Sequence, residues 1–109
     1  MAQSLVTIKK RSTFVYVRDK GKFIRSTSFN IQIFEDHKLD RIIAVGYTAT
    51  KKLGNAIIRN KSKRIMRELA RKVIIKYGKI NFYYVLIAKT SLLKKSFKDL
   101  ELELKKIII

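Results

Sequence analysis

Residues 51–76 read KKLGNAIIRNKSKRIMRELARKVIIK, and this stretch decides the fold because it predicts one long helix with two unlike faces. The predicted helix begins at Ala56, after Gly54 and a capping Asn55, and ends near Lys76, before Tyr77-Gly78. At 100° per residue, one face collects the apolar or small residues Ile58, Ser62, Ile65, Met66, Leu69 and Val73. The other face collects the polar residues Arg59, Asn60, Lys63, Arg64, Arg67 and Arg71.

The polar face of this helix carries positive charge with little to balance it. Arg59, Lys63, Arg67 and Arg71 follow one another at i, i+4 spacing, and Glu68 is the one acid in the stretch. Like charges at that spacing repel by roughly a few tenths of a kcal/mol per pair. Such a face predicts an anionic partner, and a polyphosphate chain is the obvious one.

Composition points in the same direction. The chain has 109 residues, 47% of them hydrophobic, with a net charge of +18 and a pI of about 10.4. We therefore expect one folded domain over residues 1–109, with nucleic acid as the first partner class and an anionic membrane surface as the second. Neither an apolar run of about 20 residues nor the apolar core of a signal peptide is present, so we expect a cytoplasmic protein without a membrane partner.

Three segments predict strands. Phe29, Ile31 and Ile33 alternate with polar residues, as in a half-buried strand, and residues 22–27 could add another. Residues 41–47 form a more continuous apolar run, which predicts a central strand covered on both faces. Residues 35–40 are polar and predict a hairpin turn between these two strands, and residues 83–88 predict the next strand.

The two ends of the chain give weaker patterns. Residues 1–11 are expected to be loosely held. Ser12 could cap a short helix that ends at Gly21, but the β-propensity of residues 15–17 favours a strand, and the pattern leaves both open. Ser91 is expected to cap a last helix with Leu93, Phe97, Leu100 and Leu104 at helical spacing. The predicted class is α+β, a two-layer α–β sandwich on an antiparallel-rich sheet.

The residues capable of chemistry are sparse. There is no Cys and a single His, which excludes thiolate and multi-His metal sites. The acids lack the clustering that a metal-dependent nuclease needs, and no nucleophile–base pair is evident, so we predict no catalytic residue and no metal site in this chain. Six aromatic side chains could stack on unpaired bases, although most are expected in the core: Phe14, Tyr16, Phe29, Phe34, Tyr83 and Tyr84.

Residues 52–71 closely resemble the signature of the bacterial ribonuclease P protein subunit, approximately K-x-G-N-A-V-x-R-N-R-x-K-R-x-x-R-E-x-x-R. The resemblance covers nearly the whole chain. Phe14, Val17 and Gly21 match the family's first helix, and Phe29 matches the aromatic residue of its first strand. Residues 44–46 and 85–89 match the strands on either side of the signature.

The resemblance implies a βαβ crossover of unusual left-handed form around the signature helix, against the right-handed rule. It also implies that the chain is the accessory protein of an endoribonuclease whose catalytic RNA removes the 5′ leader from precursor tRNA and leaves a 5′-phosphate. The RNA would hold most of the Mg²⁺, and no protein partner would be required. The residues implied to face the catalytic RNA are Asn55, Arg59, Asn60, Lys61, Lys63, Arg64, Arg67 and Arg71. Those implied to lie near the leader are Phe14, Phe29, Lys51, Lys52 and Lys89.

Three positions depart from the family pattern. Lys61 replaces an Arg and loses a bidentate fork, Arg18 stands where relatives often carry an aromatic residue, and Tyr83 stands where an Asp is common. A structural ribosomal protein that binds rRNA is the rival interpretation, because such proteins are similarly small and basic.

Overall fold

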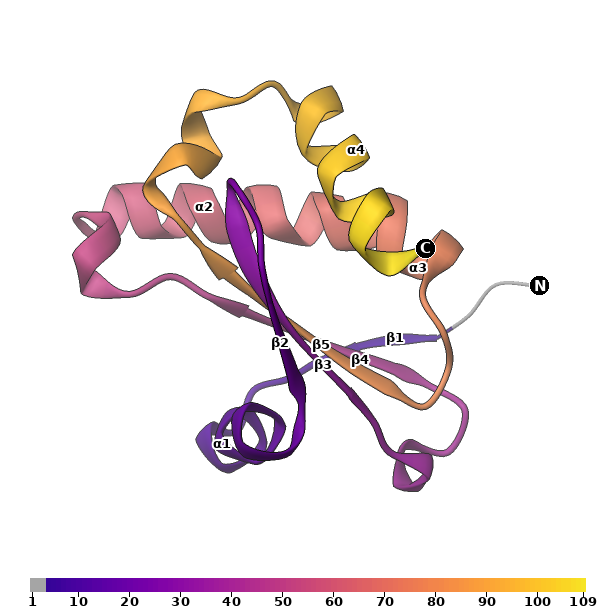
Figure 1. Cartoon of the computed structure of the whole chain (residues 1–109). Helices are drawn as coiled ribbons and strands as arrows, with labels where there is room; N and C mark the ends of the chain where they lie inside the picture. The colour runs from indigo at the N-terminus through magenta and orange to yellow at the C-terminus, as the bar shows by residue number, and fades with distance from the viewer. Residues whose placement is uncertain (1–3) are drawn as a thin grey trace.

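The computed structural model describes residues 4–109 and has one mixed sheet of five strands (Figure 1). The strands are β1 (Leu5–Thr7), β2 (Lys22–Arg25), β3 (Phe29–Glu35), β4 (Ile43–Thr48) and β5 (Phe82–Ala88). The helices are α1 (Arg11–Lys20), α2 (Ala56–Leu69), α3 (Ile75–Tyr77) and α4 (Phe97–Ile108). A π-helical turn, Ala70–Ile74, joins α2 to α3, so the predicted long helix is continuous up to Gly78.

The order of strands in the sheet is β1-β4-β5-β3-β2. β5 pairs in parallel with β4 and antiparallel with β3, and α2 provides the crossover between the two parallel strands. The predicted hairpin between β3 and β4 is therefore wrong, because β5 lies between them. The connecting segment contains a 3-10 turn, His37–Leu39, and is anchored to the residue before β5: the Arg41 backbone N–H donates to Asn81 Oδ1 at 2.6 Å.

Helices cover both faces of the sheet. α2 and α4 lie on one face and α1 on the other, as Figure 1 shows. Phe29, Ile31, Met66 and Leu100 are buried in the larger core, on the α2 side. A smaller cluster under α1 includes Val17. The α+β class and the βαβ arrangement are confirmed, and β4 is an inner strand as expected. The sheet is mixed rather than antiparallel-rich, and α1 adds a partial third layer to the predicted two.

The N-terminal segment is more ordered than expected. Residues 1–3 lie outside the described part of the chain, but Leu5–Thr7 forms the edge strand β1, paired in parallel with β4. Three residues are too few for a periodic pattern, so this strand could not be predicted from the sequence. The sequence left helix and strand open for residues 11–20, and the structure has the helix. Its N-cap is Lys10 rather than Ser12. Gly21 is its C-cap, and a larger residue would not fit there because a Cβ would lie 2.6 Å from the Val17 carbonyl oxygen.

The last helix begins later than predicted. Ser91 lies in a 3-10 turn, Thr90–Lys94, and its hydroxyl donates to the Thr27 carbonyl at 2.7 Å instead of capping a helix. Ser96 caps α4 in its place, accepting the Asp99 N–H at 3.2 Å. None of the helices within residues 4–109 combines the length and the apolar character that crossing a bilayer requires.

Glu103 on α4 fastens the turn between β2 and β3. Its carboxylate accepts hydrogen bonds from the Ser26 hydroxyl and from the Ser28 N–H and hydroxyl, the latter two at 2.8 Å. Lys95 Nζ lies 3.6 Å away. Burial by itself would raise the pKa of Glu103, but these hydrogen bonds and the Lys95 charge outweigh it and lower that pKa from 4.5. The ionised carboxylate is therefore the form that stabilises the fold.

We expect Glu103→Gln to lower the free energy of unfolding by about 2 kcal/mol at neutral pH, because charge-assisted hydrogen bonds are lost. Since the folded-state pKa is the lower one, the advantage of the wild type is complete above the ordinary pKa of 4.5 and disappears as pH falls through the folded-state value. Denaturant unfolding of both proteins across this pH range measures the difference. Glu101→Gln on the same helix is the control, and a constant difference down to low pH would contradict the assignment.

Candidate nucleic-acid interface

The basic face of α2 points to solvent because the opposite face of the helix packs on the core. Ser62, Met66 and Leu69 are buried, and the Ser62 hydroxyl donates a hydrogen bond to the Ile58 carbonyl at 2.9 Å. Asn55 caps the helix as predicted, accepting the Ile58 N–H at 3.0 Å. Ile58 is the exception on the predicted apolar face, because it lies in the first turn, beyond the sheet, and is 36% exposed.

Few of the helix's cations are neutralised by the chain itself. Within residues 4–109, Arg71 is the one cation of the predicted row that pairs with a carboxylate, through a 3.0 Å contact to Glu68. Two members of the predicted RNA-facing set, Arg59 and Lys63, are half-buried. The other six are exposed: Asn55, Asn60, Lys61, Arg64, Arg67 and Arg71. Across the described chain the buried Arg59 Nε has no hydrogen-bond partner, so the fold leaves this one donor of the guanidinium unsatisfied.

The row predicted from Arg59 to Arg71 crosses from α2 into the π-helical turn. Arg71 lies in that turn and pairs with Glu68, three residues earlier, at a spacing where side chains of a helix ordinarily meet. The members of the row without a carboxylate partner within residues 4–109 are therefore Arg59, Lys63 and Arg67, and RNA contact by all four stays a prediction.

Tyr47 of β4 makes a cation–π contact with Arg67 of α2. The Arg67 Cζ atom lies 5.7 Å from the centre of the Tyr47 ring, and Tyr47 is only 9% exposed. Burial raises the pKa of Tyr47, although the charges of Arg67 and Arg71 act against the shift. The phenol is therefore neutral at physiological pH, and its ring face is available to hold the guanidinium.

We expect Tyr47→Leu to weaken binding to an RNA partner by about two- to fivefold, because a cation–π contact at a partly exposed site contributes about 0.5–1 kcal/mol. Tyr47→Phe keeps the ring and should bind as the wild type does. Titration of both variants against the RNA measures the effect. Equal losses in both variants would assign the role to the hydroxyl group instead of the ring.

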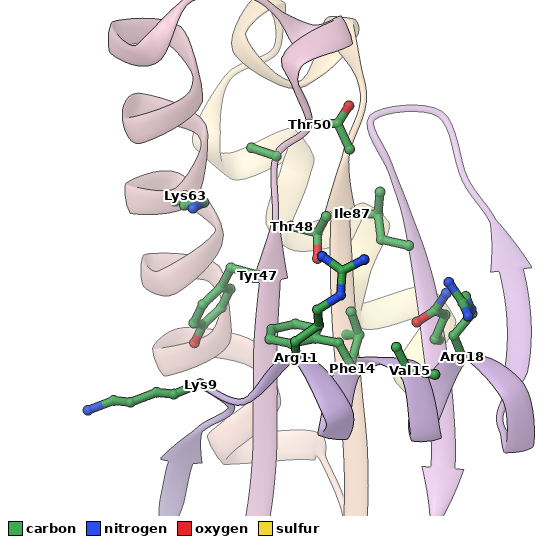
Figure 2. A pocket seen from close by; sticks show the side chains of 13 residues that line it. Lys9, Arg11, Phe14, Val15, Arg18, Tyr47, Thr48, Thr50, Lys63 and Ile87 are labelled. Atoms are coloured by element: carbon green, nitrogen blue, oxygen red, sulfur yellow. The ribbon is translucent and has the colours of Figure 1, made fainter.

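A pocket of about 580 Å³ opens on the α1 face of the sheet and extends to Lys63 of α2. Figure 2 shows Arg11, Phe14 and Arg18 reaching it from α1, with Thr48 and Ile87 on the strands behind and Lys63 at the α2 side. The other lining residues are Lys9, Val15, Gln32, Tyr47, Ala49, Thr50 and Val85. Cations around an apolar floor suit a single nucleic-acid strand, with phosphates on the rim and bases inside.

Phe14 is one of the two aromatic residues that line this pocket, with Tyr47, and its place near a leader stays a prediction. Its ring rests on Gly46 of β4, where a Cβ would lie 2.5 Å from Phe14 Cε1. Gly46 therefore creates the space for the ring, and any larger residue would displace it.

Phe29 does not line the pocket, and its ring has no exposed surface with which to stack on a leader. It is 0% exposed in the core on the α2 side, the opposite face of the sheet from α1. The aromatic residues Tyr16, Phe34 and Tyr83 form a separate cluster, with the Tyr16 hydroxyl donating to Asp36 at 3.1 Å. Tyr84 is buried.

Lys51, Lys52 and Lys89 lie just outside the pocket. They follow the parallel strands β4 and β5, so they share one end of the sheet. Lys89 Nζ donates to the Ser26 carbonyl at 2.9 Å, while Lys51 and Lys52 are exposed. The sequence did not single out Lys9, Arg11, Gln32 or Tyr47 as pocket residues, because they come from separate segments that only the sheet order brings together.

The acids and the histidine of the described chain do not form a cluster. Over residues 4–109, no three His, Asp or Glu side chains gather closely enough to hold a metal ion between them, and the absence of a metal site stays a prediction. Four of the acids are already used by neighbouring groups within the fold: Asp19, Asp36, Glu68 and Glu103.

Comparison with known proteins identifies relatives over nearly all of the chain. Residues 3–109 match the family model described as Ribonuclease P. The ribonuclease P protein component of Mesoplasma florum is 31% identical over 102 residues, covering 94% of this chain and 91% of that protein. The Caulobacter vibrioides protein component is 37% identical over 82 residues, 75% of this chain and 54% of its own length, so the chain spans about half the length of that relative.

The fold agrees with a solved structure of the same family. The Staphylococcus aureus RNase P protein superposes with a TM-score of 0.78 at 25% identity, covering 94% of this chain and 91% of the other. The agreement includes the sheet and the helices on which the basic face and the pocket depend. With a family model that matches residues 3–109 and a relative aligned over nearly its whole length, this chain belongs to the ribonuclease P protein family.

Proposed function

We propose that this chain is the protein subunit of a ribonuclease P ribonucleoprotein and assists a catalytic RNA in removing the 5′ leader from precursor tRNA. The observation that carries the proposal is the basic face of α2, whose cations Arg59, Lys63 and Arg67 have no carboxylate partner within residues 4–109. Beside it lies a pocket whose cationic rim and apolar floor suit a single strand. The α2 face binds the catalytic RNA, and the pocket binds the leader.

In this proposal the protein supplies binding and electrostatics, while the RNA supplies the chemistry. The cations of α2 reduce the repulsion between the phosphates of two RNA molecules, which lets them approach at a lower concentration of divalent ions. Mg²⁺ is held mainly by the RNA subunit and activates the attacking water there. We assign no catalytic residue to this chain, and assembly needs the RNA but no second protein.

The pocket provides the selectivity for precursor over mature tRNA, because only the precursor carries a 5′ extension. Phe14 offers a ring for one unpaired base, and Arg11 and Arg18 offer charge to the adjoining phosphates. Lys51, Lys52 and Lys89 continue the positive charge at the end of the sheet. Binding energy from the leader thereby positions the tRNA on the catalytic RNA.

Reconstitution tests the proposal directly. The purified chain is added to ribonuclease P RNA at a low Mg²⁺ concentration at which the RNA alone is nearly inactive, with 5′-labelled precursor tRNA as the substrate. We expect the chain to restore leader removal and to leave a 5′-phosphate on the mature tRNA. A ribosomal protein of similar charge is the control, and failure of this chain to exceed that protein would overturn the proposal.

A further inference from the structure

Beyond the pocket, side chains of one cross-strand row continue to the edge of the sheet. The register places Thr48 beside Ile87, Ile87 beside Asn30, and Asn30 beside Arg25, so these four side chains share a face. Thr48 and Ile87 line the pocket, whereas Arg25 is exposed on the edge strand β2. The row therefore leads out of the pocket and across β3 to β2.

The neighbouring row ends on an exposed aromatic ring. Phe23 of β2 pairs with Gln32, which lines the pocket, and Phe23 is 48% exposed. Ile24, between Phe23 and Arg25, packs into the core on the α2 side, so Phe23 and Arg25 both point to the α1 side. An apolar ring and a cation, two residues apart on a free edge, are the groups that a base and its phosphate require.

This edge is held in a fixed position. The turn after Arg25 is tied to α4 by Glu103 and to the end of β5 by Lys89, whose Nζ donates to the Ser26 carbonyl. Asn30 Oδ1 also accepts the Ser26 N–H, at 3.3 Å. A surface fixed in this way loses little freedom when it binds a ligand.

We propose that β2 carries a second subsite for the single-stranded leader, in which Phe23 stacks on an unpaired base and Arg25 binds the adjoining phosphate. The inference rests on the proposed function and extends it from the pocket to the edge of the sheet. β2 lies two strand spacings from β5, about 10 Å, so the subsite takes nucleotides upstream of those held in the pocket. It recognises an unpaired strand by its stacking faces and charge, without a required base sequence.

The test uses the reconstituted holoenzyme and precursor tRNAs whose leaders are lengthened one nucleotide at a time. For the wild type, affinity should rise in two steps, first as the leader fills the pocket and again as it reaches β2. Phe23→Ala should remove the second step, with a loss of about fivefold for long leaders and none for short ones. Phe23→Trp should restore it, and Arg25→Ala should reduce the salt dependence for long leaders alone.

Two matched controls come from the chain itself. Val6→Ala alters an apolar side chain of similar exposure, 45%, on the opposite edge strand, and Lys22→Ala removes a cation of β2 that points to the other face. Neither should change the second step. An unchanged second step in Phe23→Ala, or an equal loss for short and long leaders, would overturn the proposal. Failure of the wild type to cleave short-leader precursors would instead reject the proposed function, so the two results are distinguishable.

Discussion

Replacing Arg59 and Arg64 together with alanine is expected to give the largest loss of holoenzyme assembly among the changes considered. Both belong to the α2 face, and neither forms an ion pair within the described residues. Each phosphate contact that is lost should reduce the slope of log affinity against log salt by roughly one unit. The double variant should therefore bind the catalytic RNA more weakly at low salt and respond less steeply to added salt.

The matched control removes the same charge elsewhere. Lys38 and Lys79 are exposed at the end of the sheet opposite Lys51, Lys52 and Lys89, so Lys38→Ala with Lys79→Ala lowers the net charge equally and spares the α2 face. Filter binding over a range of salt concentrations compares the two double variants. If the slope of log affinity against log salt fell equally in both double variants, binding would depend on net charge and not on the α2 surface.

Phe14→Ala is expected to have the second large effect, on the selection of precursor over mature tRNA. The ring lines the pocket and contacts Gly46, and stacking on one base contributes roughly 1–3 kcal/mol, or about 5- to 150-fold in affinity. The affinity for precursor tRNA should fall by a factor in this range, while the affinity for mature tRNA stays nearly constant. The ratio of the two affinities is the measurement, because a general loss of folded protein cancels in it.

A second substitution tests the position of the Phe14 ring without removing the ring. Gly46→Ala keeps Phe14 but places a methyl group where its ring lies, so the ring must move out of the pocket. The ratio should fall in this variant as well. An equal loss of affinity for precursor and mature tRNA in both variants would remove Phe14 from the leader site.

Local patterns predicted most of the elements but not the arrangement of the strands. The alternation at residues 29–33 and the apolar run at 43–47 each predict a strand, and both strands are present. A polar segment between two strands most often indicates a hairpin, yet β5 pairs with both of them. Strand pairing depends on long-range packing that periodicity does not contain, and the three-residue β1 is too short to have a period at all.

For the candidate site, the sequence likewise predicted what lies within one helix but not what separate segments bring together. Helical spacing places Arg59, Lys63 and Arg67 on one face, because that face follows from geometry within a single helix. Phe29 was assigned to the leader by the resemblance. Alternation separates the two faces of a strand without indicating which helix covers each, so the pattern could not show that its ring is buried on the α2 side. Tyr47 and Phe23 escaped notice for the related reason that their roles arise between segments distant in sequence.

The central position of β5 also has a consequence for the newly made protein. Translation delivers the cationic helix α2 before β5, whose Val85 and Ile87 form the pocket floor. A partly synthesised chain thus already presents positive charge to an anionic partner while the pocket is still incomplete. Under the proposed function, attraction to the catalytic RNA would precede recognition of a 5′ leader, and the insertion of a single strand would separate the two stages.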